Sequence, residues 1–151
     1  MFNIKGVILG LLMLISLSSC KEYRYVVAED VQPYVEEYLD ILKSNGIKYK
    51  NQDIYVVFDN LMKYTTFAGY AHGMFEKDYV RVSIHKSYWY SLSDRQKKIL
   101  IFHELSHDLF DSLHTWDVFI MQPQMHSRFA AEYVNWDQAI KELVKYIKNG
   151  R

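Results

Sequence analysis

The chain has 151 residues, half of them hydrophobic and 16% aromatic, which is enough for the core of one domain. Eighteen Lys and Arg residues balance eighteen Asp and Glu residues, and no long block of either sign occurs. Proteins that stack nucleic-acid bases on aromatic rings also present a basic groove, and no basic stripe accompanies the many tyrosines here. We therefore expect a single compact domain that binds no nucleic acid.

The first twenty residues are typical of an export signal. Lys5 precedes the apolar run 6–17, which is too short to span a bilayer. The run ends at Leu17-Ser18-Ser19-Cys20, and this ending resembles the lipobox of bacterial lipoproteins, where the signal is removed and the cysteine is acylated. The resemblance implies a signal peptide at 1–19 and a lipid anchor at Cys20. The alternatives are an ordinary cleaved signal and a buried lone cysteine.

This interpretation sets the expected domain organisation and location. Cys20 is the only cysteine, so an internal disulfide is excluded. Residues 20–30 would form a tether with lipidated Cys20, and residues 31–151 a single domain. The expected location is the cell envelope, on the outer membrane or the cell surface, with the membrane contacted through the lipid. The sequence does not indicate an oligomeric state.

The first elements are expected to be a helix and two or three strands. Apolar residues recur at helical spacing from Val31 to Leu42, and Gly46 is a natural stop. Residues 54–58 are rich in β-branched and aromatic residues, and 79–85 alternate cleanly, so both are predicted strands. Residues 67–73 are expected as a further strand or a structured loop, and 76–78 as a hairpin turn.

A second helix is expected at the centre of the domain. Ser93 and Gln96 form a capping-box pair before the apolar-rich run 99–113. Apolar residues on more than one face of this helix predict that it is buried. After an irregular stretch, Ser127 is expected to cap a last helix that runs to Gly150. The order predicts an α+β domain.

The central helix contains the motif His103-Glu104-Leu105-Ser106-His107, an HExxH pattern. Four residues at 100° each bring the second histidine to within about 40° of the first, so both imidazoles can bind one ion. Zinc suits neutral imidazole nitrogens, and a catalytic zinc keeps its fourth position for water. Glu104 can then act as general base and acid. As ordinary residues of a buried helix, these polar side chains would be costly.

A catalytic zinc needs a third protein ligand. His114 is the leading candidate, because a turn after the expected helix end could bring it back to the motif. Asp117 is a nearby alternative, and Glu132 on the last helix would give a site of the thermolysin type.

Residues 103–114, HELSHDLFDSLH, followed by Ile120-Met121-Gln122-Pro123, resemble the metzincins. In that family the helix ends, turns to a third histidine and later passes a Met-turn beneath the metal. The chain is similar to a small bacterial subgroup of metzincin-like proteins, loosely over most of its mature length. The usual metzincin spacing has one residue fewer before the third histidine and a glycine near the position of Phe110 and Asp111.

The resemblance implies a compact zincin-like domain, with a small mixed sheet on the HExxH helix and helices at both ends. It implies that His103, His107 and His114 bind zinc, that Glu104 is catalytic and that Met121 lies below the metal. The strand 79–85 would be an edge strand that pairs with substrate, or else a simple sheet strand. His72 and His85 are expected outside the metal site. The oxyanion could be stabilised by any of Tyr70, His72, Tyr88, His126 and Tyr133.

These expectations give a function. The chain is expected to be a zinc-dependent metallopeptidase that hydrolyses peptide bonds of extracytoplasmic proteins or peptides through a zinc-activated water. The alternative is a lipid-anchored binding or structural module with a non-catalytic zinc site.

Overall fold

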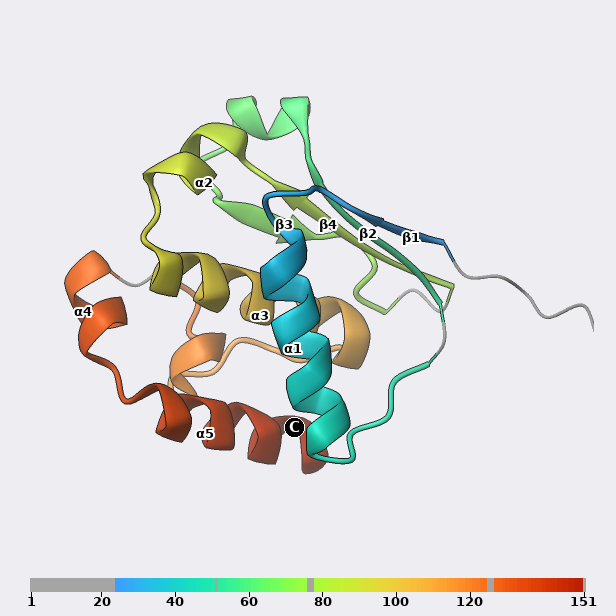
Figure 1. The fold of residues 1–151 in the computed structure, drawn as a ribbon, viewed down its shortest axis with the longest axis vertical. Coiled ribbons are helices and arrows are strands. Elements are labelled where there is room, and N and C mark those ends of the chain that lie inside the picture. The colour runs from blue at the N-terminus through green and yellow to red at the C-terminus, as the bar shows by residue number, and fades with distance from the viewer. Residues whose placement is uncertain (1–23, 51, 76–77, 125–126, 151) are drawn as a thin grey trace, which may run out of the picture.

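The computed structural model describes residues 24–50, 52–75, 78–124 and 127–150, and these form a small sheet with helices packed on it (Figure 1). The sheet has the order β1-β2-β4-β3. The strands β1, β2 and β4 are parallel neighbours, and β3 runs antiparallel to β4. The sheet is therefore mixed, as predicted, and the organisation agrees with the α+β class. The strands are β1 (Tyr25–Val27), β2 (Asp53–Phe58), β3 (Gly69–Ala71) and β4 (Tyr79–Ile84).

The helices lie on one side of this sheet, with α3 between the sheet and α5 (Figure 1). In chain order they are α1 (Gln32–Ser44), α2 (Lys86–Ser91), α3 (Asp94–Phe110), α4 (Arg128–Tyr133) and α5 (Trp136–Lys148). Two short 3₁₀ helices are also present: η1 (Asn60–Tyr64) lies between β2 and β3, and η2 (Phe119–Met121) lies between α3 and α4.

Helix α3 is the central element that its sequence predicts. Ser93 Oγ accepts a hydrogen bond from the Gln96 N–H at 3.3 Å, and Gln96 Oε1 accepts one from the Ser93 N–H at 3.0 Å. This capping box satisfies two backbone donors at the helix start. Ile101, Phe102 and Leu105 are fully buried. Both the predicted start and the predicted burial of this helix are confirmed.

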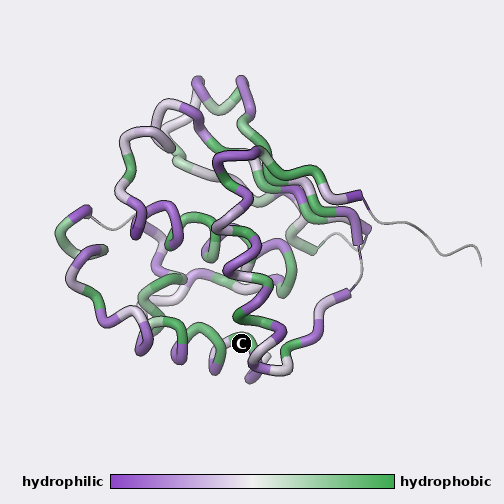
Figure 2. Tube along the Cα trace, in the orientation of Figure 1, coloured by the Kyte–Doolittle hydropathy of each residue, from purple (hydrophilic) through white to green (hydrophobic). Residues whose placement is uncertain are grey.

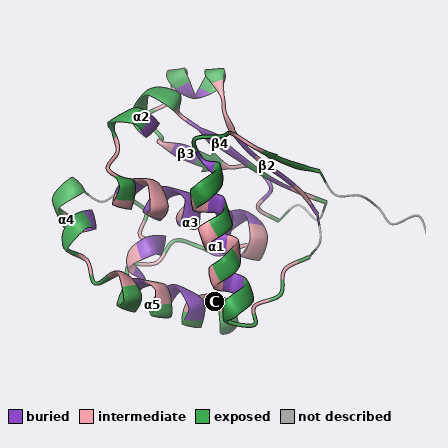
Figure 3. Ribbon diagram, viewed as in Figure 1, coloured by how far each residue is buried: buried purple, intermediate pink, exposed green. Residues whose placement is uncertain are grey.

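Helix α1 is also confirmed, and it is joined to α3 by a buried hydrogen bond. The Tyr38 hydroxyl lies 2.8 Å from Ser106 Oγ, and Ser106 donates its own proton to the Phe102 carbonyl at 2.6 Å. Tyr38 therefore donates to Ser106. Hydrophobic stretches of the strands and helices face one another across this core (Figure 2), and the outer turns of α1 and α5 are exposed (Figure 3).

The C-terminal part of the chain differs from prediction. One helix was expected from Ser127 to Gly150, but two are present, because Val134 is extended and ends α4. The Asn135 side chain then accepts the Gln138 N–H at 3.1 Å and starts α5. Ser127 does cap α4, as predicted. Asn is among the best N-cap residues, so the break follows local chemistry that the apolar periodicity concealed.

Strand β1 and helix α2 are among the elements that the sequence-based expectations did not include. Strand β1 lies within residues 20–30, which were expected to be a tether, and it extends the sheet as a parallel neighbour of β2. Helix α2 starts at His85, whose Nδ1 accepts the Tyr88 N–H. The ordered domain therefore begins before residue 31.

The expected signal peptide at 1–19 and Cys20 lie outside the described residues. Within the described part of the chain, no helix is both long enough and apolar enough to cross a membrane.

The capping box can be tested directly. Replacing Ser93 with Ala should lower the free energy of unfolding by about 1 kcal/mol, because the Gln96 N–H at the start of α3 loses its acceptor. Urea denaturation of the variant measures this loss, and Ser87→Ala on the exposed face of α2 is the matched control. Equal stability of the two variants would show that the box contributes nothing.

Candidate metal centre

Three histidines bring their ring nitrogens to one point. His103 and His107 lie on α3, and His114 lies on the loop between α3 and η2. The Nε2 atoms of His103 and His107 are 3.0 Å apart, and each is 3.1 Å from Nε2 of His114. This group of ionisable side chains can hold a metal ion. The structure thus brings His114 to the two histidines of the HExxH motif.

Backbone carbonyls fix the tautomers of two of these rings. Nδ1 of His103 lies 2.7 Å from the Ile120 carbonyl oxygen, and Nδ1 of His107 contacts the Ser112 carbonyl oxygen. A carbonyl only accepts, so each Nδ1 carries the proton and donates it. In the neutral rings, Nε2 then turns a lone pair toward the common point. Lone pairs at this separation repel one another unless a cation lies between them, and carbonyl-oriented imidazoles are usual around metals.

The spacing of the nitrogens fits zinc. Two imidazole nitrogens on a tetrahedral zinc, each about 2.0–2.1 Å from the ion, are separated by about 3.3 Å. The observed separations of 3.0 to 3.1 Å are within a few tenths of an ångström of this value. Three histidine ligands are also the number that a catalytic zinc has when its fourth position is left for a non-protein group.

The turn that returns His114 to α3 forms without the glycine of the metzincin pattern. Asp111 caps α3 in the left-handed conformation, with φ 51° and ψ 30°. Asp is one of the few residues besides glycine that adopt this region readily. The Ser112 N–H donates to the Ser106 carbonyl at 3.3 Å and closes the turn. The longer spacing before His114 therefore still directs the ring to the site.

Hydrogen bonds hold the loop beyond this turn. The Thr115 N–H donates to the Met121 carbonyl at 3.0 Å, and the Tyr146 hydroxyl of α5 donates to the Leu113 carbonyl at 3.0 Å. Met121 is fully buried in η2, next to Ile120, whose carbonyl orients His103. The loop that carries His114 is thus anchored at both ends.

Glu104 lies in a buried environment beneath β3. Burial raises the pKa of its carboxyl group to about 8, and the charge of Asp108 acts in the same direction. A hydrogen bond from the Ala71 backbone of β3 lowers the pKa and offsets part of that rise. A Cβ atom at Gly69 would lie 3.1 Å from Oε1 of Glu104 and 2.9 Å from Leu100 Cδ1. Small residues in β3 therefore let the strand approach this carboxyl group closely.

The alternative third ligands do not join the cluster. Asp117 and Glu132 are exposed, and neither belongs to the metal-binding group found among the described residues. His72 and His85 also lie elsewhere, as expected. Nε2 of His72 is 2.8 Å from Ser83 Oγ on the sheet, and His85 caps α2.

Two further sequence-based expectations concern the strand that pairs with substrate and the residue that stabilises the oxyanion. The strand expected at 79–85 is not an edge strand, because β4 lies between β2 and β3 and its backbone is paired on both sides. The interpretation as a substrate-pairing edge strand is therefore wrong, and the alternative, a simple sheet strand, is confirmed; β3 is the edge strand next to α3. Tyr70, Tyr88 and Tyr133 are exposed, and His126 lies outside the described residues.

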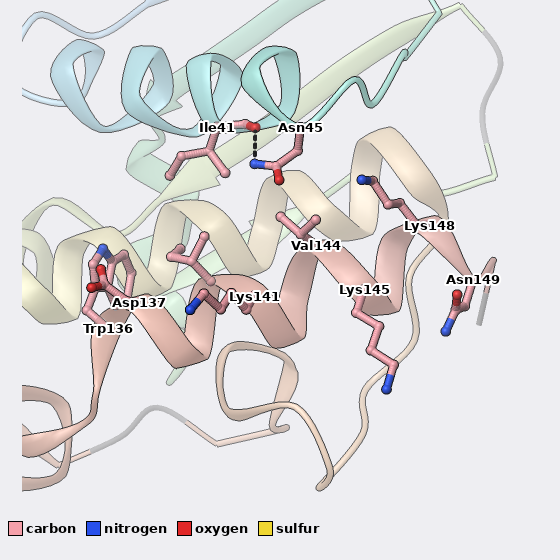
Figure 4. Close-up of a pocket in the computed structure, with 10 residues that line it drawn as sticks. Ile41, Asn45, Trp136, Asp137, Lys141, Val144, Lys145, Lys148 and Asn149 are labelled. Carbon is pink, nitrogen blue, oxygen red and sulfur yellow. Dashed lines mark hydrogen bonds between the residues drawn. The ribbon is translucent and has the colours of Figure 1, made fainter.

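A groove between α1 and α5 is separate from the three histidines (Figure 4). Ile41 of α1 and Asn45, which caps this helix, line one side. The other side is lined by residues at the start, middle and end of α5: Trp136, Asp137, Ile140, Lys141, Val144, Lys145, Lys148 and Asn149. None of the predicted site residues lies in this groove.

Comparison of the chain with protein-family models, with curated proteins and with solved structures finds no match. The likeness to the metzincins therefore depends on the residues quoted from the sequence, and the site is interpreted from its own geometry.

Removal of one imidazole at a time tests the metal site. His103→Ala, His107→Ala and His114→Ala should each reduce zinc from about one ion per chain to near zero after dialysis, because two imidazoles alone bind weakly. Atomic absorption gives the content. Asp117→Ala and Glu132→Ala are the controls and should keep their zinc. Stoichiometric zinc in His114→Ala would show that this residue is not a ligand.

The buried carboxyl group gives a pH dependence in the metal-free protein. The folded state keeps a proton on Glu104 up to about pH 8, against an ordinary pKa of 4.5. Its contribution to stability is therefore complete below pH 4.5 and is lost as the pH rises to about 8. The unfolding free energy of Glu104→Gln should fall less across this interval than that of the parent. Denaturation curves at several pH values, with Glu132→Gln as control, measure the difference; parallel curves would contradict it.

Proposed function

We propose that this protein is a zinc-dependent metallopeptidase, with His103, His107 and His114 as the ligands and Glu104 as the general base. The observation that carries the proposal is the convergence of three Nε2 atoms at 3.0 to 3.1 Å, one of them from outside the HExxH motif. The motif alone needs only two histidines on one helix face. A third imidazole at hydrogen-bond distance from both completes a set of three protein ligands, which is the number that a catalytic zinc has.

Zinc in such a site supplies an electrophile that polarises a carbonyl oxygen and lowers the pKa of water. The chain itself supplies the proton transfers. Glu104 takes a proton from the attacking water as the new C–O bond forms, and gives it to the leaving amine as the C–N bond breaks. The positive charge of a bound zinc would lower the pKa of this carboxyl group from its metal-free value of about 8, toward the carboxylate form that a general base needs.

Strand β3 supports the binding of an extended peptide. The His72 N–H donates to the Arg81 carbonyl, and the Ala68 carbonyl accepts from the His85 N–H. Because backbone groups alternate in direction along a strand, those of Gly69 and Ala71 point away from β4, toward the edge at which no further strand of the sheet pairs with β3. The Ala71 backbone is hydrogen-bonded to Glu104, and β3 packs on α3, so this edge lies beside the proposed catalytic residue. A substrate backbone could add to it as a further strand and lie beside the metal centre.

The proposed location follows from the sequence alone. Acylation of Cys20 would hold the domain at the cell envelope and make extracytoplasmic proteins or peptides its substrates. The oxyanion could be stabilised by Tyr70, which lies on β3 itself.

The rival function is a lipid-anchored module whose zinc only holds the loop to α3. A closed structural site needs a fourth protein ligand. Among the described residues, no fourth His, Cys, Asp or Glu belongs to the cluster. This favours the peptidase.

Replacement of Glu104 separates metal binding from catalysis. Glu104→Gln should bind one zinc per chain and cleave a peptide library about 10²–10⁴-fold more slowly than the parent, since the amide cannot accept the proton. Mass spectrometry of the library gives the rates, and Glu132→Gln is the matched control. Cleavage by zinc-loaded Glu104→Gln at the parental rate would refute the mechanism, and a zinc-loaded parent that cleaves nothing would favour the structural module.

A further inference from the structure

Strand β3 packs on α3 (Figure 1), and two rows of residues face each other between these elements. On the helix, Leu100, Glu104 and Asp108 are four residues apart, a rise of about 6 Å each. On the chain above, Gly69, Ala71 and Gly73 are two residues apart, about 6.6 Å in extended backbone. The two spacings nearly match, so the small residues can follow the helix for two turns.

The contacts between the rows follow this match. The Cβ position of Gly69 is 2.9 Å from Leu100 Cδ1, and the backbone of Ala71 is hydrogen-bonded to Glu104. At Gly73, a Cβ atom would lie 2.5 Å from Oδ1 of Asp108 and 2.6 Å from the Tyr79 carbonyl oxygen. One of these neighbours is backbone and cannot move aside, so only glycine fits at position 73.

Asp108 accepts hydrogen bonds from both sides of the β3–β4 hairpin, one from β4 and one from the segment that follows β3. Its Oδ2 accepts the Arg81 N–H of β4 at 2.7 Å, and the Gly73 N–H also donates to this carboxyl group. In a regular antiparallel pair, the Arg81 N–H would donate to His72, whose own N–H already donates to the Arg81 carbonyl. Asp108 therefore replaces a sheet hydrogen bond with one to α3.

The next turn of the same helix makes a second attachment. Oδ1 of Asp111, the residue that caps α3, accepts the N–H of Phe75, which has a positive φ of 67°. The segment after β3 is thus tied to the C-terminal turn of α3 at two points. Asp108 directly follows His107 in the chain, but it is not part of the histidine cluster.

We propose that Asp108 is a positioning residue, which holds β3 at a fixed height and register above the HExxH turn through Gly73 and Arg81. A peptide added to the open edge of β3 then presents its scissile carbonyl to the histidines and Glu104. This inference rests on the proposed peptidase function, but the attachment itself can be tested without catalysis.

Amide hydrogen exchange of the full-length, zinc-loaded protein tests the attachment. In Asp108→Ala, amide exchange at Arg81, Gly73 and Ala71 should accelerate by about tenfold or more. The Arg81 and Gly73 N–H groups lose their acceptor, and Ala71 lies on the strand that these two hydrogen bonds hold in place. Asp108→Asn should restore most of the protection at Arg81, because the amide oxygen still accepts. Asp40→Asn, on the exposed face of α1, is the matched control. Unchanged exchange at Ala71 in Asp108→Ala would overturn the proposal.

Kinetics then separate positioning from metal binding. For a peptide long enough to pair with β3, Asp108→Ala should raise KM about tenfold with little change in kcat and with one zinc per chain. Asp108→Asn should lie close to the parent. Loss of zinc would show that the substitution disturbs the ligand His107, and a fall in kcat with KM unchanged would show that it disturbs Glu104. Either result would overturn the proposal. If the parent cleaves no peptide, the proposed function fails, and the exchange experiment still decides whether Asp108 holds β3.

Discussion

The mutual approach of three imidazole nitrogens is the constraint on which the rest of the site depends. The Nε2 atoms of His103, His107 and His114 lie 3.0 to 3.1 Å apart, and carbonyls fix the first two rings as Nε2 acceptors. Such an arrangement is unfavourable without a cation at its centre. A metal ion bound here would offset this repulsion, so metal binding and folding of the loop that carries His114 would be coupled.

The remainder of the fold holds this arrangement in place from three directions. Helix α3 is fixed to α1 by the Tyr38–Ser106 hydrogen bond, inside the HExxH motif itself. From below, η2 presents the carbonyl that orients His103, and α5 holds the loop through Tyr146. From above, β3 lies on the helix and bonds Glu104. The site is thus held by side-chain and backbone groups of elements far apart in the sequence.

This arrangement places two ionisable acids in a buried environment. Burial raises the pKa of Glu104 to about 8 and that of Asp108 to about 7. Oδ1 of Asp108 also has no hydrogen-bond partner among the described residues. The burial of two ionisable groups and the unsatisfied oxygen of Asp108 reduce the stability of the fold. Residues that reduce stability in this way are expected mainly at functional sites.

The sequence by itself determined the local features. The capping box of Ser93, the period of α1, the alternation of β4 and the spacing of His103 and His107 each depend on neighbours within one or two turns. Tertiary structure decided the rest. The order of strands made β3, not β4, the open edge, and the left-handed Asp111 brought His114 rather than Asp117 or Glu132 to the site. The close contact of Gly73 with Asp108 could not be predicted either, although Gly69 and Gly73, two residues on either side of Ala71, are the feature of the sequence that permits it. Local periodicity specifies how a segment folds, whereas strand order and loop direction depend on packing between segments distant in the chain.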